Sequence, residues 1–256
     1  MCISDRYSSG NGIVLVTGPT GSGKSTTLYA TLTRINTVEE HIITIEDPVE
    51  RQLEGIIQGH VNERAGMTFA AALRSMLRQD PDVIMVGEMR DRETADLAIR
   101  AALTGHLVFS TLHTNSAAAS YTRLTDMGCD PFLLTTTIRA ILAQRLIRKL
   151  CVRCKVKYRP TEKDLKSIGL KQLDGFIYHA NEKGCKSCGK DGYSGRAGLY
   201  ELLSPNEAIN EAVKIEASAE EVSRIAQDNK MRMLEDTARS YVTKGETSIE
   251  EINRVL

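Results

Sequence analysis

A run of nine residues near the start of the chain has the residue types and spacing of a phosphate-binding loop. It consists of Gly18, Pro19, Thr20, Gly21, Ser22, Gly23, Lys24, Ser25 and Thr26. In the pattern G-x-x-x-x-G-K-[ST], backbone N–H groups surround the phosphates, the lysine reaches the β- and γ-phosphates, and the final hydroxyl binds Mg²⁺. The alternative is a glycine-rich turn that fits the pattern by chance. The run therefore predicts that Lys24 and Ser25 hold a nucleoside triphosphate with its Mg²⁺.

The flanks of this run favour the phosphate site over a chance turn. Residues 12–17 are apolar and β-branched, as in a buried strand, and residues 25–35 contain no Gly or Pro, which favours a helix. A strand that leads into a helix through glycines points several N–H groups, and the positive end of the helix, at one place. An anionic phosphate suits that place.

Four cysteines form a second set with the spacing of a chemical site. Cys151 and Cys154 make one C-x-x-C pair, and Cys185 and Cys188 make another after thirty intervening residues. Four thiolates suit tetrahedral Zn²⁺, and with no fifth ligand the site is closed, hence structural rather than catalytic. Two unrelated thiol pairs, or a redox C-x-x-C, are the alternatives.

Polar residues follow three further apolar runs, at 42–45, 83–86 and 107–110. They include Glu50, Glu88 and His113. The carboxyl ends of parallel strands share one edge of a sheet, where ligands bind. Two carboxylates and an imidazole suit triphosphate hydrolysis, which must hold Mg²⁺ and orient a water. Singly, each could be a solvated loop residue, a helix cap or a satisfied histidine; together with the phosphate loop they favour a functional site.

These runs alternate with helical patterns up to about residue 150, which predicts an α/β fold with a doubly wound parallel sheet. Helices are expected at 69–77, 93–103, 116–126, 131–149, 208–215, 219–229 and 233–244, with a terminal stretch after Gly245. Residues 151–198 are rich in turns, and their Lys and Arg outnumber Asp and Glu by eleven to five. The expected domains are therefore a core (1–150), a four-cysteine module (151–198) and a helical C-terminal region (199–256).

Composition and charge describe a soluble globular protein. The chain has 256 residues, 41% of them hydrophobic, and 33 Lys and Arg balance 33 Asp and Glu. Such a balance argues against wholesale electrostatic binding to nucleic acid or membrane. No apolar run approaches the roughly 20 residues that span a bilayer, and the first residues lack the apolar core of a signal peptide. The sequence therefore predicts a cytoplasmic protein with reduced thiols.

The basic module invites comparison with a nucleic-acid-binding domain. Its aromatic residues are not interleaved with Lys and Arg along the sequence in a base-stacking pattern. A solvated basic face, or a docking surface for a protein partner, is therefore the preferred interpretation.

Four stretches together resemble the secretion-type traffic ATPases, which power type II secretion and type IV pilus assembly. In family terms these are the Walker A loop (18–26), the Asp box (45–50), an atypical Walker B region (77–91) and the His box (104–114). The resemblance covers nearly the whole chain. It implies a RecA-like P-loop NTPase core that uses ATP and Mg²⁺, together with a Zn²⁺ module.

The resemblance also implies partners and a location. It indicates a homo-oligomer, a hexameric ring, that acts on inner-membrane platform proteins of a secretion or pilus machine. The protein would be cytoplasmic and peripheral to the inner membrane through these partners, with no nucleic acid. The four-cysteine module points to the secretion and pilus-extension branches rather than to pilus retraction.

Roles for individual residues follow from the same motifs. Lys24 and Ser25 bind phosphate and Mg²⁺, as the loop pattern alone predicts. The resemblance implies that Glu50 lies near the metal and the attacking water. It makes Glu88 the carboxylate that orients or deprotonates that water, and it makes His113 and His106 contacts of the γ-phosphate.

Three other positions are of interest in this comparison. Gly87 stands where other P-loop proteins place a metal-binding Asp, so Mg²⁺ must rely on Ser25, waters and more distant carboxylates. Arg90 and Arg145 are candidates for a subunit interface, although surface ion pairs would explain them equally well.

Family members carry N-terminal domains that dock to the platform and supply arginines to a neighbour's ATP, whereas seventeen residues precede Gly18 here. The chain is thus expected to be an excised motor domain or a shortened relative. Arginines supplied in trans are worth ~10³–10⁵ in rate in other phosphoryl-transfer enzymes, so we expect binding with low turnover. The alternatives are a RecA-like nucleic-acid motor and a non-hydrolysing, nucleotide-gated ring scaffold. Glu50, Glu88 and His113 argue against the scaffold.

Overall fold

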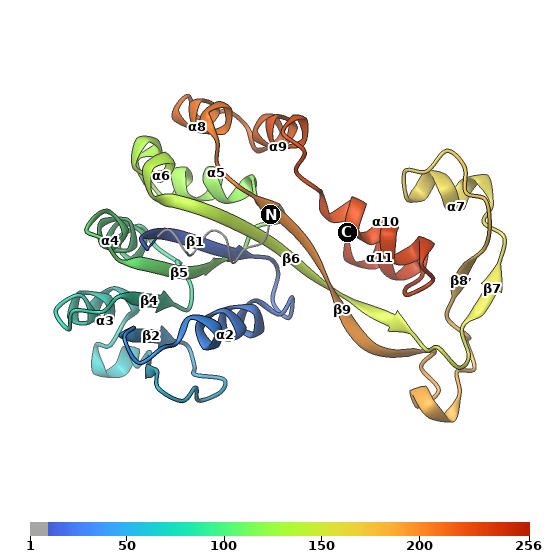
Figure 1. The fold of residues 1–256 in the computed structure, drawn as a ribbon, viewed down its shortest axis with the longest axis horizontal. Coiled ribbons are helices and arrows are strands. Elements are labelled where there is room, and N and C mark those ends of the chain that lie inside the picture. The colour runs from blue at the N-terminus through green and yellow to red at the C-terminus, as the bar shows by residue number, and fades with distance from the viewer. Residues whose placement is uncertain (1–9) are drawn as a thin grey trace. The chain divides into compact units, whose positions relative to one another are not determined.

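The chain forms two compact units, as seen in a computed structural model that describes residues 10–256 (Figure 1). Unit 1 comprises the chain up to Ala143 and residues 202–231, and unit 2 comprises residues 144–201 and 232–256. Two long strands, β6 (Ile138–Leu150) and β9 (Tyr193–Leu203), have residues in both units. The segments expected as domains, 1–150, 151–198 and 199–256, do not coincide with these units, and their independence stays a prediction.

Unit 1 is built on a sheet whose strand order is β3-β2-β4-β5-β1-β6-β9. The remaining strands are β1 (Gly12–Thr17), β2 (Ile42–Glu46), β3 (Ile57–His60), β4 (Val83–Val86) and β5 (Leu107–Leu112). β1 pairs in parallel with β5 and β6, β2 with β3 and β4, and β4 with β5. The predicted parallel α/β core is confirmed, and the carboxyl ends of these strands share one edge.

Helices cover this sheet so thoroughly that its central strands are buried on both faces. The helices of unit 1 are α2 (Lys24–Ile35), α3 (Phe69–Met76), α4 (Arg92–Leu103), α5 (Ala119–Asp126), α6 (Pro131–Thr137), α8 (Glu207–Lys214) and α9 (Ala219–Asp228). Of these, α8 packs against α6 and α9 packs against α5. Side chains alternate between the faces of a strand, and all six residues of β1 are buried. On one face, Leu28 and Leu32 of α2 pack in a cluster with Val14 and Phe109. Burial on both faces explains why these strands are continuous apolar runs.

The predicted helix over residues 131–149 is wrong. α6 begins as expected, with Asp130 as its N-cap and Pro131 in its first turn, but the chain continues from Ile138 as β6. β6 pairs with β1, and residues 140–143 are at most 6% exposed. An apolar run buried on both faces fits a helix and a strand equally well, so pairing with β1 decides its structure. β3, β9 and the short strands and helices within residues 151–198 were also not predicted.

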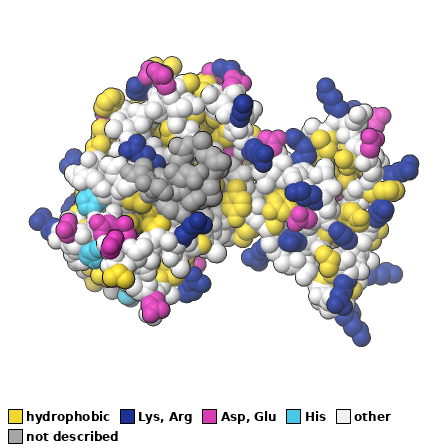
Figure 2. All heavy atoms as spheres, in the orientation of Figure 1, with side chains coloured by type: hydrophobic (Ala, Val, Ile, Leu, Met, Phe, Trp, Pro, Cys, Tyr) yellow, Lys and Arg dark blue, Asp and Glu magenta, His cyan; other side chains and the backbone are white. Residues whose placement is uncertain are grey.

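Unit 2 contains the four-cysteine segment and the C-terminal helices. Its elements are the antiparallel pair β7 (Val156–Tyr158) and β8 (Ile177–His179), together with α7 (Glu162–Ser167), α10 (Leu234–Thr243) and α11 (Ile249–Val255). Figure 2 shows Lys and Arg side chains gathered over the visible face of this unit. Within residues 10–256, no helix has the length and apolar character needed to cross a membrane.

The buried carboxylate of Glu251 ties α11 to β6 within unit 2. Its side chain is fully buried and forms ion pairs with Arg148 at 2.8 Å and with Arg254 at 2.6 Å. Arg148 also donates its backbone N–H to Glu251 Oε1 at 2.8 Å and lies 4.0 Å above the Tyr193 ring. Because a buried charge is costly without partners, these contacts make Glu251 a specific anchor of the C-terminal helix.

Candidate functional site

The phosphate-loop residues connect β1 to α2 and form a tight loop around the Lys24 ammonium group. Gly18, Gly21 and Gly23 have φ values of 148°, 77° and 88°, which residues with a Cβ rarely adopt. Lys24 Nζ donates to Gly18 O at 2.8 Å and to Pro19 O at 3.1 Å. The loop therefore has the backbone conformation and the central cation that a phosphate cradle requires.

Ser25 and Glu50, which the sequence assigns to the metal, are brought together. Ser25 Oγ, in the first turn of α2, donates to Glu50 Oε1 at 3.0 Å, and Glu50 lies in the segment after β2. Hydroxyl and carboxylate oxygens are the ligand types that Mg²⁺ prefers in proteins. The residues present thus fit a Mg²⁺ ion beside the phosphate loop.

Glu88, after β4, is the centre of a second group of polar side chains. Its Oε1 lies 2.5 Å from Arg90 Nη2, and its Oε2 lies 3.7 Å from His113 Nε2. Arg90 Nη2 also contacts Asp47 Oδ2 at 3.2 Å. The Glu88 side chain is 19% exposed, so the carboxylate is partly shielded yet open to a small molecule. Arg90 therefore has carboxylate partners within its own chain.

Burial and the nearby Lys24 ammonium lower the pKa of His113 below its usual 6.5, with Glu88 opposing and Arg90 reinforcing the shift. The imidazole is therefore neutral at pH 7. A neutral imidazole can accept or donate one hydrogen bond beside a phosphate without adding charge. The effect of Lys24 also indicates that the phosphate loop and the segment after β5 belong to one electrostatic site.

Two threonines that the sequence analysis did not single out join those segments. Thr17 Oγ1, at the end of β1, lies 2.6 Å from Thr114 Oγ1, and the Thr114 N–H donates to Thr17 Oγ1 at 3.0 Å. Both residues are buried, so these bonds are shielded from water. They hold the start of the phosphate loop beside His113. The sequence signal was a hydroxyl residue directly before Gly18 and another directly after His113.

Three predicted residues have other surroundings. His106 precedes β5 at the opposite, amino-terminal edge, where its Nδ1 lies 2.9 Å from Ala101 O, so it is not brought to the site. A Cβ on Gly87 would lie 3.2 Å from Ile45 O, so an Asp would crowd the backbone there. Arg145 is 7% exposed, and burial lowers its pKa, against the expectation of an interface arginine.

The four predicted cysteine ligands form one cluster in unit 2. Their Sγ atoms all lie within 4.8 Å of one another. The separations are 3.7 Å for Cys151 and Cys185, 3.8 Å for Cys154 and Cys188, and 3.7 Å for Cys185 and Cys188. A tetrahedron with Zn–S bonds of ~2.3 Å has edges of about 3.8 Å. The geometry therefore fits a Zn²⁺ ion.

Backbone N–H groups favour the thiolate form of Cys188, whereas burial raises the pKa of the Cys154 thiol to about 12. The N–H groups of Cys185 and Gly192 donate to Cys188 Sγ at 3.2 and 3.3 Å and lower the pKa of the Cys188 thiol to about 6. Gly192 has a φ of 77°, and a Cβ there would lie 2.7 Å from Asn181 O. Such N–H···S bonds orient metal-binding thiolates.

The structure also pairs basic and aromatic residues that are apart in the sequence. Where β7 pairs with β8, Lys155 Nζ lies 4.3 Å from the Tyr178 ring centre and Lys157 Nζ lies 4.0 Å from that of Phe176. A lysine of the same chain therefore lies over each of these two rings.

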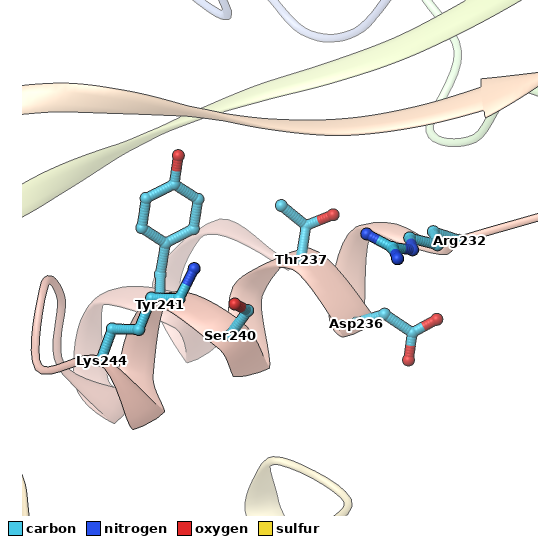
Figure 3. Close-up of a pocket in the computed structure, with 6 residues that line it drawn as sticks. All are labelled: Arg232, Asp236, Thr237, Ser240, Tyr241 and Lys244. Carbon is cyan, nitrogen blue, oxygen red and sulfur yellow. The ribbon is translucent and has the colours of Figure 1, made fainter. Parts of the chain in front are cut away.

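A separate polar hollow of about 550 Å³ follows one face of α10 (Figure 3). Its lining residues are Arg232, Asp236, Thr237, Ser240, Tyr241 and Lys244. All of them come from α10 and its two flanks. The hollow is thus one open helix face, and it contains none of the predicted site residues.

Comparison with known proteins gives consistent matches. The family described as "Type II/IV secretion system protein" matches residues 3–254. Type II secretion system protein E of Pseudomonas aeruginosa is 50% identical over 245 residues, which cover 96% of this chain and 48% of that protein. Type IV pilus assembly ATPase PilB of Thermus thermophilus is 47% identical over 94% of this chain and 27% of that protein. The chain thus spans about half the length, or less, of these relatives.

Solved structures with a similar fold include a pilus retraction motor and an ATPase. The pilus retraction motor PilT with bound ADP has a TM-score of 0.70 and 34% identity, over 94% of this chain and 60% of that chain. The Legionella pneumophila ATPase DotB has a TM-score of 0.69 and 26% identity, over 98% of this chain and 62% of that chain.

Proposed function

The chain belongs to the type II/IV secretion system protein family, and we propose that it is an ATPase domain that powers type II protein secretion or type IV pilus assembly. The observation that carries this proposal is the convergence of Lys24, Ser25, Glu50, Glu88 and His113 at one edge of the parallel sheet. The relatives, a type II secretion protein and a pilus assembly ATPase, support the choice of process.

In the proposed reaction the protein binds ATP and activates a water molecule. Lys24 and the N–H groups of residues 18–26 bind the phosphates. Ser25 and Glu50 would hold Mg²⁺, which would supply positive charge beside the phosphates. Glu88 accepts a hydrogen bond from the attacking water and orients it or takes its proton. Neutral His113 contacts the γ-phosphate side of the site.

Arg90 has a role within the same chain in this proposal. Because it bridges Glu88 and Asp47, it holds the Glu88 carboxylate and the segment after β2 together. An arginine that stabilises the transferred phosphate would then be a residue other than Arg90.

The assembly and its surroundings are proposed from the family and from the cluster geometry. Copies of the chain assemble into a ring, which we propose is hexameric, and the ring acts on inner-membrane platform proteins from the cytoplasmic side. Zn²⁺ in the cysteine cluster holds the 151–198 segment folded and takes no part in hydrolysis. The names of the relatives give no support to the alternatives of a nucleic-acid motor or a non-hydrolysing scaffold.

Steady-state ATP hydrolysis by the purified chain, measured across protein concentration with and without a hexamerising tag, tests this function. We expect low specific activity in the monomer and a steep rise on assembly. Lys24→Ala defines the background, and the exposed Lys214→Ala is the matched control. Assembled protein that hydrolyses ATP no faster than Lys24→Ala contradicts the proposed function. Flat, high activity contradicts a shared site.

A further inference from the structure

We propose that Tyr29 is a positioning residue, which holds Glu50 against Ser25 through a buried network centred on Glu46. The inference rests on the proposed function. Tyr29 and Ser25 are four residues apart on α2, so they lie on the same helix face. Both contact Glu50. Ser25 Oγ donates to the Glu50 carboxylate at 3.0 Å, and the backbone N–H of Glu50 donates to the Tyr29 hydroxyl at 3.1 Å.

The Tyr29 hydroxyl is itself held by the buried carboxylate of Glu46, at the end of β2. It donates to Glu46 Oε2. Glu46 Oε1 accepts from Thr44 Oγ1 at 2.6 Å and from Gln58 Nε2 at 3.0 Å. Tyr29 and Glu46 are 3% and 5% exposed, so water does not replace these bonds. The hydroxyl thus uses both its donor and its acceptor capacity, which leaves it one orientation.

Gln58 of β3 holds the far side of the same segment. Its Nε2 donates to Arg51 O at 3.1 Å, and its Oε1 accepts from the Leu53 N–H at 2.7 Å. Residues 50–53 are therefore anchored at Glu50 by Tyr29, and at Arg51 and Leu53 by Gln58. Glu46 joins the two anchors, so the segment that carries Glu50 has one defined path beside α2.

The Tyr29 ring also packs in the hydrophobic core. A test of its action on Glu50 must therefore change the hydroxyl and keep the ring. Tyr29→Phe keeps the ring and removes only the hydroxyl. It releases the Glu50 N–H and one lone pair of Glu46, while Lys24 and the phosphate loop are untouched. Displacement of a catalytic group by ~1 Å costs up to ~10²-fold in rate. We therefore expect kcat to fall roughly 10- to 100-fold, with the affinity for nucleotide in the absence of Mg²⁺ unchanged.

The test measures kcat, KM and nucleotide affinity of the assembled Tyr29→Phe chain, with hydrogen exchange of the Glu50 amide as a readout independent of activity. The matched control is Tyr121→Phe, since the Tyr121 hydroxyl is buried in unit 1 without a hydrogen-bond partner. We expect faster amide exchange at Glu50 in Tyr29→Phe but not in Tyr121→Phe. If the variant misfolds, Gln58→Ala, at a partly exposed edge position, should lower kcat in the same direction.

A double-mutant cycle separates positioning from a structural role. If Tyr29 acts through the Glu50 carboxylate, Tyr29→Phe should lower kcat in the native background and have no further effect in Glu50→Gln. Wild-type kcat in Tyr29→Phe, or an equal loss in both backgrounds, overturns the inference. Failure of the proposed function is distinguishable, because it appears as absent hydrolysis in the wild type, while amide exchange at Glu50 still tests the positioning.

Discussion

Glu88 and His113 follow different strands, yet His113 Nε2 lies 3.7 Å from Glu88 Oε2. β4 and β5 pair in parallel with Val86 opposite Ser110, so the segments that follow them leave the sheet side by side. The expected carboxylate and imidazole therefore meet at the edge where the phosphate loop begins. The role of Glu88 can be tested by hydrolysis, and that of His113 by its pKa.

Glu88→Gln should retain nucleotide binding and lose hydrolysis. The two side chains have the same shape, but the amide cannot take a proton from water, and general-base catalysis contributes ~10²–10⁴-fold. Nucleotide affinity and steady-state hydrolysis of the assembled chain check this. Glu93→Gln, an exposed carboxylate on α4, is the matched control. Hydrolysis by Glu88→Gln at the wild-type rate would refute the role assigned to Glu88.

His113 should titrate below pH 6.5 in the nucleotide-free chain, and Lys24→Ala should raise its pKa. Burial and the Lys24 charge both disfavour the imidazolium, so removing that charge makes protonation easier. NMR titration of the imidazole protons measures both values. Lys214→Ala, which removes an exposed lysine on α8, should leave the titration of His113 where it was. An unchanged pKa in Lys24→Ala would show that the two groups are not coupled.

Cys151→Ser should release Zn²⁺ and destabilise unit 2 while the phosphate loop remains folded. A structural Zn²⁺ contributes folding free energy directly, about 10 kcal/mol or more in zinc-finger peptides. Metal content per chain and protease sensitivity of residues 151–198 report the loss, and nucleotide binding reports the phosphate loop. Cys129→Ala, a buried cysteine of unit 1, should keep the metal. Full metal content in Cys151→Ser contradicts the proposed ligand set.

Glu251→Gln should remove stability that depends on pH. Burial alone raises the pKa of Glu251, but hydrogen bonds from Arg254 and Arg148 outweigh burial and lower the pKa from 4.5 to about 2. A depressed carboxyl pKa stabilises the fold above pH 4.5, and this contribution is lost as the pH falls toward 2. At 1.36 kcal/mol per pKa unit the contribution is about 3 kcal/mol.

Urea unfolding of unit 2, followed from pH 7 to pH 3, measures this contribution. The wild type should exceed Glu251→Gln by about 3 kcal/mol at pH 7, and the difference should shrink below pH 4.5. Glu250→Gln changes the neighbouring, exposed carboxylate and should behave as the wild type. A difference between the wild type and Glu251→Gln that is constant with pH would exclude the ionised carboxylate as its source.

Much of the fold could be predicted because its signals are local. The strands near 12–17, 42–45, 83–86 and 107–110 are short apolar runs bounded by polar or glycine residues, and the structure confirms them as β1, β2, β4 and β5. α3 follows the apolar spacing that begins at Phe69, with Thr68 as its cap. The four-cysteine cluster could be predicted because two C-x-x-C pairs are typical of a metal site and uncommon otherwise.

The sequence by itself was enough to predict the phosphate loop, the cluster of four cysteines and the polar residues at the ends of the strands, since each prediction depends on residue type and short spacing. Only the tertiary structure decided that residues 138–150 are a strand, that His106 faces the opposite edge, and that Tyr29 and Glu46 hold Glu50 beside Ser25. The physical reason is that strand pairing and buried hydrogen bonds join segments far apart in the chain. The local periodicity of the sequence does not indicate which strand another strand pairs with, or which group a hydroxyl bonds to.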